Sequence, residues 1–127
     1  MNENRAAKWL LAAALALCFA QNLPFFADRW VEDDSWYSVP AYTLYTEGRI
    51  RMPVFAGSAW EELWVLPPGP ALIAQPILRA FGFGLYPLRL TSLLMVVGII
   101  VGTYYLGKVV CSELAGGLAA ILVASDN

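Results

Sequence analysis

This chain of 127 residues is 59% hydrophobic and only 14% charged, whereas soluble domains carry about 25% charged residues. A net charge of −2 and scattered basic residues exclude a nucleic-acid surface, which gathers lysine and arginine on one face. Because the chain has no histidine, it also lacks the usual zinc sites and any histidine-based triad. We therefore expect an all-α integral membrane protein, built as a multi-span helical bundle.

The first predicted span covers residues 9–26, an apolar run that follows Arg5 and Lys8. At 1.5 Å per residue it is about 27 Å long, close to the ~30 Å hydrocarbon core of a bilayer. A cleaved secretory signal peptide is the alternative, since a basic start precedes an apolar core. The later spans favour an uncleaved first helix. Cys18 and Cys111 both lie in or beside apolar runs, and we interpret them as small buried hydrophobic residues.

The loop over residues 27–66 is where we expect the chemistry. It carries seven acids and three arginines, and three of the acids are adjacent at 32–34. The sequence after them predicts a short helix over about 35–47, which Gly48 would end in a left-handed conformation. Because this helix is rich in Trp and Tyr, we expect it to lie in the membrane interface and not to cross the bilayer.

The residues at the start of that helix have a structural and a functional interpretation. Asp33 and Asp34 favour a helix N-terminus, where acids complement the dipole for roughly 0.3–1 kcal/mol. The alternative is that they serve as catalytic carboxylates. Trp36 and Tyr37, with the other aromatic residues of the loop, form either an interfacial belt or a wall against which a sugar or isoprenoid stacks.

Further apolar segments follow the loop. Residues 67–83 are predicted to span although a Gln-Pro pair and Arg79 interrupt them, since Pro67-Pro68 can open a helix and Arg79 can reach the headgroups. Residues 88–110 include 18 uncharged residues, enough to cross. The segment 114–127 is a partial span, so we interpret the chain as the N-terminal part of a longer polytopic protein.

Basic residues give weak support for one orientation. The positive-inside tendency counts lysine and arginine near the ends of spans, and with these four segments each side carries four. We expect a cytoplasmic N-terminus, with the acidic loop 27–66 extracytoplasmic.

The order of these features resembles the start of the type C glycosyltransferases, which use polyprenyl-phosphate sugars. Within this superfamily, the chain resembles the protein O-mannosyltransferases and the bacterial aminoarabinose transferases that modify lipid A. The matching features are an N-terminal span, Asp33-Asp34-x-x-Tyr37, Gly48, Pro53, Pro67-Pro68 opening the next segment, "FGFGLYPLRLTS", "YYLGK" and "LAGGLAAILVAS".

The resemblance implies a membrane enzyme, in a bacterial inner membrane, that transfers a sugar from a polyprenyl-phosphate donor to a hydroxyl of a lipid, glycan or protein acceptor. Asp33 would be the general base of a single inverting displacement, and Asp34 would orient it or contact the acceptor. Tyr37 and Trp36 would contribute to the substrate site.

One feature departs from the family. Many relatives place a lysine or histidine directly before the Pro-Pro pair to hold the donor phosphate, and here that position is Leu66. Arg49 and Arg51 either face solvent and headgroups or take over this role by binding the lipid phosphate. A divalent metal is the other way to neutralise the leaving group, but two aspartates are too few ligands for an all-protein metal site. No cofactor or metal ligand is assigned.

A transporter or lipid flippase is the alternative function. Acids near membrane depth mark ion pathways, but a transporter is expected to place a charge or a broken helix near the bilayer centre. Gln75-Pro76 is the one candidate for such a break.

Overall fold

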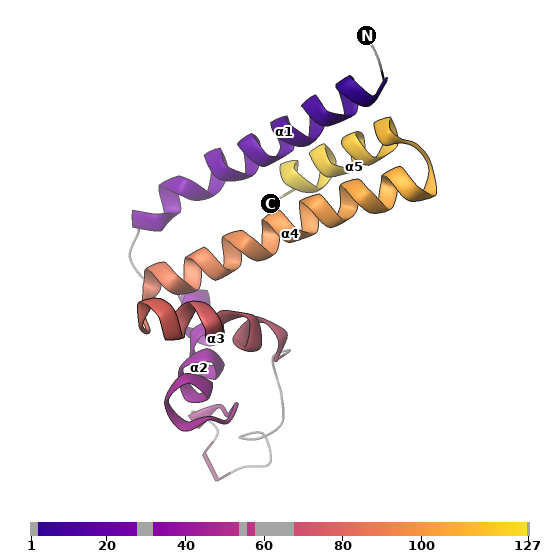
Figure 1. The fold of residues 1–127 in the computed structure, drawn as a ribbon. Coiled ribbons are helices and arrows are strands. Elements are labelled where there is room, and N and C mark those ends of the chain that lie inside the picture. Colours follow the sequence, from indigo (N-terminus) through magenta and orange to yellow (C-terminus); the bar gives the residue numbers. More distant parts are fainter. Residues whose placement is uncertain (1–2, 28–31, 54–55, 58–67, 127) are drawn as a thin grey trace. The chain divides into compact units, whose positions relative to one another are not determined.

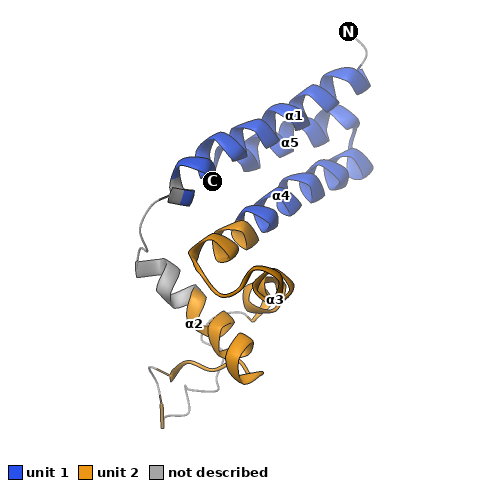
Figure 2. Cartoon of the chain, turned by 60° about the vertical axis from the view of Figure 1, so that its left-hand side comes forward, with its two compact units in different colours: residues 1–28, 93–127 blue, residues 29–92 orange. Residues whose placement is uncertain are grey.

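The computed structural model describes residues 3–27, 32–53, 56–57 and 68–126, with the backbone alone at 25, 27 and 32–37. Throughout these residues the fold is all-helical, as predicted (Figure 1). The chain forms two compact units, residues 1–28 with 93–127, called unit 1, and residues 29–92, called unit 2 (Figure 2). The elements are α1 (Glu3–Asn22), the 3-10 helix η1 (Leu23–Ala27), α2 (Glu32–Glu47), α3 (Gly69–Phe81), α4 (Leu85–Val110) and α5 (Glu113–Ser125).

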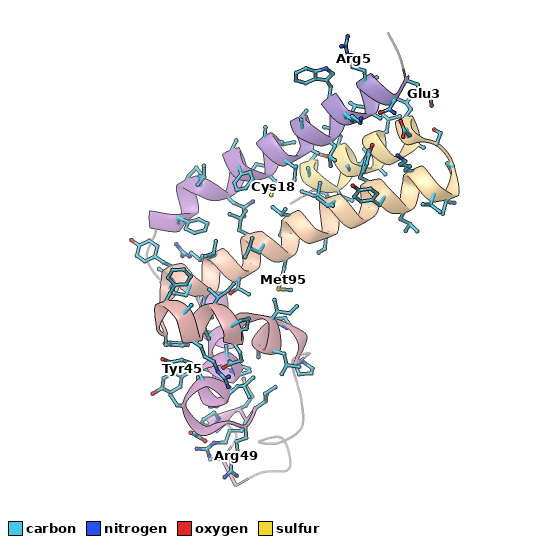
Figure 3. All side chains as sticks on the ribbon, in the orientation of Figure 1. Glu3, Arg5, Cys18, Tyr45, Arg49 and Met95 are labelled. Carbon is cyan, nitrogen blue, oxygen red and sulfur yellow. The ribbon has the colours of Figure 1, made fainter. Side chains whose placement is uncertain are left out.

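Unit 1 packs α1 against a helical hairpin made by α4 and α5 (Figures 1 and 2). The buried core residues that α1 and α5 contribute all have small side chains. Cys18 lies on the side of α1 that faces the hairpin (Figure 3). The buried core residues are Ala7, Ala14, Cys18, Leu93, Ile100, Tyr104, Ala120 and Ala124.

Glycines set the distance between the helices of unit 1. A Cβ added at Gly116 would run into the backbone carbonyl oxygen of Tyr104, and one added at Gly107 would lie 2.7 Å from the Cα of Gly116. A Cβ at Gly117 would lie 3.0 Å from the Cβ of Leu10. Small residues at such crossings let backbones approach closely, which is the usual way that helices associate inside a membrane.

These contacts also fix the directions of the helices within unit 1. Gly117, near the start of α5, lies against Leu10 near the start of α1, and Gly116 lies against Gly107 near the end of α4. The start of α1, the end of α4 and the start of α5 therefore meet at one end of the unit. It follows that α1 runs antiparallel to α4, as both views show (Figures 1 and 2).

The turn between α4 and α5 is short and capped. The side chain of Ser112 accepts a hydrogen bond from the N–H of Ala115 at 3.2 Å, and Lys108 forms an ion pair with Glu113 across the turn. Cys111 lies in this turn and is exposed. Its prediction as a buried residue is therefore wrong, because the helix ends before it, whereas Cys18 is buried as predicted.

Unit 2 packs α2 against α3, around the buried side chains of Ala41, Ala71, Ala74 and Leu78. The predicted helix after the three acids is confirmed, but it begins at Glu32, so that the acids form its first turn. It ends as predicted at Gly48, which has φ of 73° and donates its N–H to the carbonyl of Leu44 at 3.2 Å.

Helix α3 begins after Pro68 and ends at Gly82, which has φ of 81° and donates its N–H to the carbonyl of Leu78 at 2.8 Å. Proline at the start of a helix costs nothing, because the first N–H groups have no intrahelical partner. With 13 residues, α3 is about 20 Å long.

Within the described part of the chain, one helix is both long and apolar enough to cross a membrane, and this is α4. Only 17% of its most apolar 18-residue window is buried within the protein, so much of its apolar surface is turned outward. The shorter helix α5 is also apolar. The span predicted over 88–110 thus corresponds to α4, whereas further crossings over 9–26 and 67–83 stay predictions.

Candidate functional site

The predicted catalytic acids occupy the first turn of α2. Asp33 and Asp34 directly follow Glu32, the first residue of the helix, and Trp36 and Tyr37 lie in the next turn. The first N–H groups of a helix have no carbonyl partner and give this end a partial positive charge, which favours carboxylates. The side chains of these four residues lie outside the described part of the structure, so that their geometry stays a prediction.

The segment that follows α2 folds back along the helix and is held there by Thr43. The hydroxyl oxygen of Thr43 accepts a hydrogen bond from the backbone N–H of Arg51 at 3.2 Å. Its own hydrogen can go to the carbonyl of Arg51 at 3.1 Å or to that of Pro40 at 3.2 Å. Thr43 is only 1% exposed, so these bonds are shielded from water. They fix where Arg49 and Arg51 emerge, beside the C-terminal end of α2 (Figure 3 labels Arg49).

The two predicted phosphate-binding arginines differ in their surroundings. Arg51 donates from Nε to Oε2 of Glu47 at 2.6 Å and from a terminal nitrogen to Oε1 at 2.9 Å. This hydrogen bond is the main reason that the pKa of Glu47 lies below its ordinary value, with Arg49 adding a smaller electrostatic contribution. A phosphate that binds Arg51 would therefore compete with Glu47, whereas the side chain of Arg49 is exposed.

An aromatic cluster joins α2 to the segment between α3 and α4. The rings of Tyr42 and Phe83 meet edge to face with centroids 4.9 Å apart, and Tyr45 lies 6.5 Å from Phe83. Tyr42 is 48% exposed and Tyr45 is 39% exposed, so the cluster offers an aromatic surface to a ligand or to lipid. Trp60 and Trp64, which belong to the predicted aromatic wall, lie outside the described residues.

The side of α2 next to these tyrosines is used for packing. Ala41 is buried and Leu44 is half-buried against α3, so these positions of the helix predicted to lie in the membrane interface are covered by protein. Gln75 of α3 donates its side-chain N–H to the carbonyl of Ala41 at 3.1 Å and to that of Ala71 at 3.3 Å. The polar residue that interrupts this apolar segment therefore ties α3 to α2.

Metal ligands do not gather among the residues that the structure describes, since no group of three or more His, Cys, Asp or Glu side chains is close enough to share an ion. The side chains of Asp33 and Asp34 lie outside the described residues. The divalent metal considered for the leaving phosphate is therefore without an assigned ligand set.

Two parts of this site were not predicted from the sequence. The bonds between Thr43 and Arg51 depend on the chain turning back after Gly48, and Phe83 joins the tyrosines across more than 35 residues of sequence. The pairing of Glu47 with Arg51 could have been predicted from the sequence, because oppositely charged residues four positions apart often pair.

Comparison with protein-family models, with curated proteins and with solved structures finds no match to this chain. A functional interpretation therefore depends on the sequence motifs and on the arrangement of α2, α3 and the segment between α2 and residue 53.

Proposed function

We propose that this chain is the N-terminal part of a membrane glycosyltransferase of the type C kind, which moves a sugar from a polyprenyl-phosphate donor to an acceptor hydroxyl. The observation that carries the proposal is the placement of Asp33 and Asp34 in the first turn of α2, the first α-helix after the N-terminal apolar helix. This is where the resemblance expects the catalytic acids. The surrounding membrane would be a bacterial inner membrane, with the N-terminus cytoplasmic and α2 on the extracytoplasmic side.

Asp33 acts as the general base in this proposal. The acceptor hydroxyl donates a hydrogen bond to the carboxylate and attacks the anomeric carbon from the face opposite the phosphate. The new bond joins the acceptor oxygen to the anomeric carbon, and the bond from that carbon to the phosphate oxygen breaks. Its electron pair leaves with the polyprenyl phosphate, the proton passes to Asp33, and the anomeric configuration inverts. Positioned bases of this kind typically contribute 10²–10⁴-fold to a rate.

The start of a helix suits an ionised base. Its unpaired N–H groups favour the charged form of nearby carboxylates, so Asp33 would be ready to accept a proton at neutral pH. Asp34, at the next position, would orient Asp33 or contact the acceptor. Tyr37 and Trp36, one turn further along α2, would contribute to the wall of the substrate site.

The leaving phosphate needs positive charge close to it. Arg49 is the better candidate of the two arginines, because its side chain is exposed while Arg51 is engaged by Glu47. The aromatic surface of Tyr42, Tyr45 and Phe83 suits stacking with a sugar ring or contact with an isoprenoid chain. Because the donor is a lipid, these groups have to lie at the membrane interface to meet it.

The test replaces Asp33 by Asn in the protein at its full natural length, assayed in membranes with a polyprenyl-phosphate donor carrying a labelled sugar. Asn also favours a helix N-terminus, so α2 should still form. We expect the rate of sugar transfer to fall by about 10²-fold or more, while the protein still binds the lipid donor.

Glu32→Gln is the matched control, since it removes one negative charge from the same helical turn without touching the proposed base. We expect it to change the rate by a few-fold at most. Transfer that survives Asp33→Asn would remove Asp33 from the mechanism. Equal losses in both variants would mean that the charge of the first turn matters and not a base at one position.

The sequence also allowed a polytopic transporter or lipid flippase. That alternative depended on Gln75-Pro76 as a polar break at membrane depth, and Gln75 is instead engaged by the carbonyls of Ala41 and Ala71. The labelled donor separates the two functions, because a flippase would move the sugar across the bilayer while it stays attached to the lipid.

A further inference from the structure

The antiparallel arrangement of α1 and α4 constrains the path of the chain between them. Within unit 1, the end of α1 lies at the end of the unit where its part of α4 begins (Figures 1 and 2). If both helices cross the bilayer, residues 28–84 leave it and return to it on the same face. A single crossing by α3 would place these two ends on opposite faces, which the packing of unit 1 does not allow.

The dimensions of α3 agree with this constraint. Its 13 residues cover about 20 Å, whereas a crossing needs about 30 Å. Helix α3 is also joined to α4 by only Gly82–Gly84. The Cα atoms of Phe81 and Leu85 can therefore be at most about 14 Å apart, so α3 has to end close to the point where α4 enters the membrane.

Apart from Arg79 near its end, the exposed side of α3 is apolar. One side of the helix, with Ala71, Ala74 and Leu78, is buried against α2. On the other side Leu72 is 55% exposed and Ile73 is 49% exposed, and the following exposed residues Pro76 and Ala80 continue this surface. A helix that faces water carries polar residues on its outer side, so this surface requires an apolar partner.

We infer that α3 lies in the plane of the membrane interface, on the same face of the bilayer as α2, with its exposed apolar side in contact with lipid. Arg79, exposed near the end of α3, is then placed to meet headgroup phosphates. The lipid is the partner because α3 leads directly into the candidate membrane helix α4. This arrangement replaces the crossing that the sequence predicted over 67–83. It rests on the membrane embedding that the proposed function includes, and not on sugar transfer.

Charge alone does not select the orientation of this arrangement. Within about 20 residues of the span ends, each face of the membrane carries three basic residues. These are Arg5, Lys8 and Lys108 on one face, and Arg29, Arg79 and Arg89 on the other.

Two cysteine positions test the path of the chain. The native Cys111 is exposed in the turn between α4 and α5, while Cys18 is buried and should not react. Ala56→Cys, in a Cys111→Ser background, reports on the segment between α2 and α3, where Ala56 is exposed. The protein at its natural length is labelled in sealed membrane vesicles of known sidedness with a maleimide that cannot cross the bilayer.

We expect Cys111 and the cysteine at position 56 to react from opposite sides of the vesicle. Reaction from the same side would mean that α3 crosses, which would overturn the inference. Reaction of both positions in protein that washes off the membrane at high pH would overturn the inference together with the membrane embedding. None of these outcomes depends on whether the protein transfers a sugar.

A depth measurement tests the lipid contact itself. Ile73→Cys and Ala80→Cys are seven residues apart on the exposed side of α3, and a nitroxide label at each reports its depth through its accessibility to oxygen and to a water-soluble nickel chelate. For a helix in the membrane plane we expect both labels in the lipid phase at depths that agree within a few ångströms. A crossing helix would separate them by about 10 Å.

The control pair lies on α4, where Ile99 is 56% exposed and Leu106 is 66% exposed, also seven residues apart. Labels at these positions should differ in depth by about 10 Å. Labels on α3 that are more accessible to the nickel chelate than to oxygen would contradict the lipid contact.

Discussion

Replacing Gly116 by Ala should break the closest helix contact in unit 1. A methyl group at this position would run into the backbone carbonyl oxygen of Tyr104 and lie 2.9 Å from the backbone nitrogen of Lys108. Both atoms belong to the backbone of α4, which cannot move away as the end of a flexible side chain can. Helices α4 and α5 would have to separate by several tenths of an ångström or more, and the packing of α5 against α1 would change with them.

The expected cost follows from known effects of overpacking. Extra methyl groups in a closely packed core typically cost 1–3 kcal/mol, and the backbone contacts of Gly116 place this substitution near the upper end, at about 3 kcal/mol. Gly98→Ala is the matched control, because a Cβ at Gly98 would meet nothing within 4 Å. In the interior of a helix, Ala is more favourable than Gly by roughly 0.5–1 kcal/mol. The two variants should therefore differ by about 3–4 kcal/mol, which is more than a hundredfold in the folding equilibrium.

The assay is equilibrium unfolding of the purified protein in mixed detergent micelles, titrated with dodecyl sulfate and followed by far-ultraviolet circular dichroism. We expect Gly98→Ala to unfold at the same dodecyl sulfate fraction as the parent or at a higher one, and Gly116→Ala at a clearly lower one. If Gly116→Ala is as stable as Gly98→Ala, the close crossing of α4 and α5 is not present in the protein.

Two further predictions concern the end of α2. Thr43→Val removes the hydroxyl that accepts a hydrogen bond from the backbone N–H of Arg51. Loss of this acceptor should lower the free energy of unfolding, measured in the same titration, by about 1–3 kcal/mol. Thr46→Val, at an exposed position of the same helix, should cost much less, and equal losses would contradict the structural role of Thr43. For Glu47, the hydrogen bond from Arg51 lowers the pKa below the ordinary 4.5, so the ion pair contributes stability above that pH, and this contribution is lost as the pH falls through the lower folded-state pKa. A ¹³C NMR titration should find the carboxyl of Glu47 below 4.5 and find it raised in Arg51→Gln; an unchanged pKa would contradict the pairing.

Much of the helical fold was predictable because its signals are local. The apolar run of α4 and the glycine at position 48 indicated a long helix and a helix end, and both are confirmed. The start of α2 was predicted at about residue 35, which is too late, because the helix already includes the three acids as its first turn. Acids are favoured in the first turn of a helix, and Glu32 is indeed its first residue.

The packing was less predictable because its signals are spread along the chain. Gln75 bonds to the carbonyl of Ala41, 34 residues earlier, and Gly117 lies against Leu10. Apolar periodicity cannot indicate which of several apolar helices pack together or in which direction. For that reason the antiparallel arrangement of α1 and α4, on which the path of the loop depends, was absent from the sequence prediction.

The candidate site was predictable in its residue types and only partly in its contacts. The sequence after the three acids predicted a helix with acids at its N-terminus, and α2 has the acids in its first turn. From the sequence, Arg49 and Arg51 were equal candidates for binding the donor phosphate. In the structure Glu47 engages Arg51, so the exposed Arg49 is the better candidate for binding it. The fold of the segment after Gly48 creates this difference.

The most direct test of the proposed glycosyltransferase activity measures where a labelled sugar is found after the reaction. Membranes that contain the protein at its natural length are given a polyprenyl-phosphate donor with the label in the sugar, and the label is then measured in the lipid-phosphate fraction and in the acceptor fraction. We predict that the label leaves the lipid phosphate and appears in a glycoside of inverted anomeric configuration. Label that remains on the lipid phosphate, whether it stays in place or changes leaflet, would contradict the proposal that this chain belongs to a glycosyltransferase.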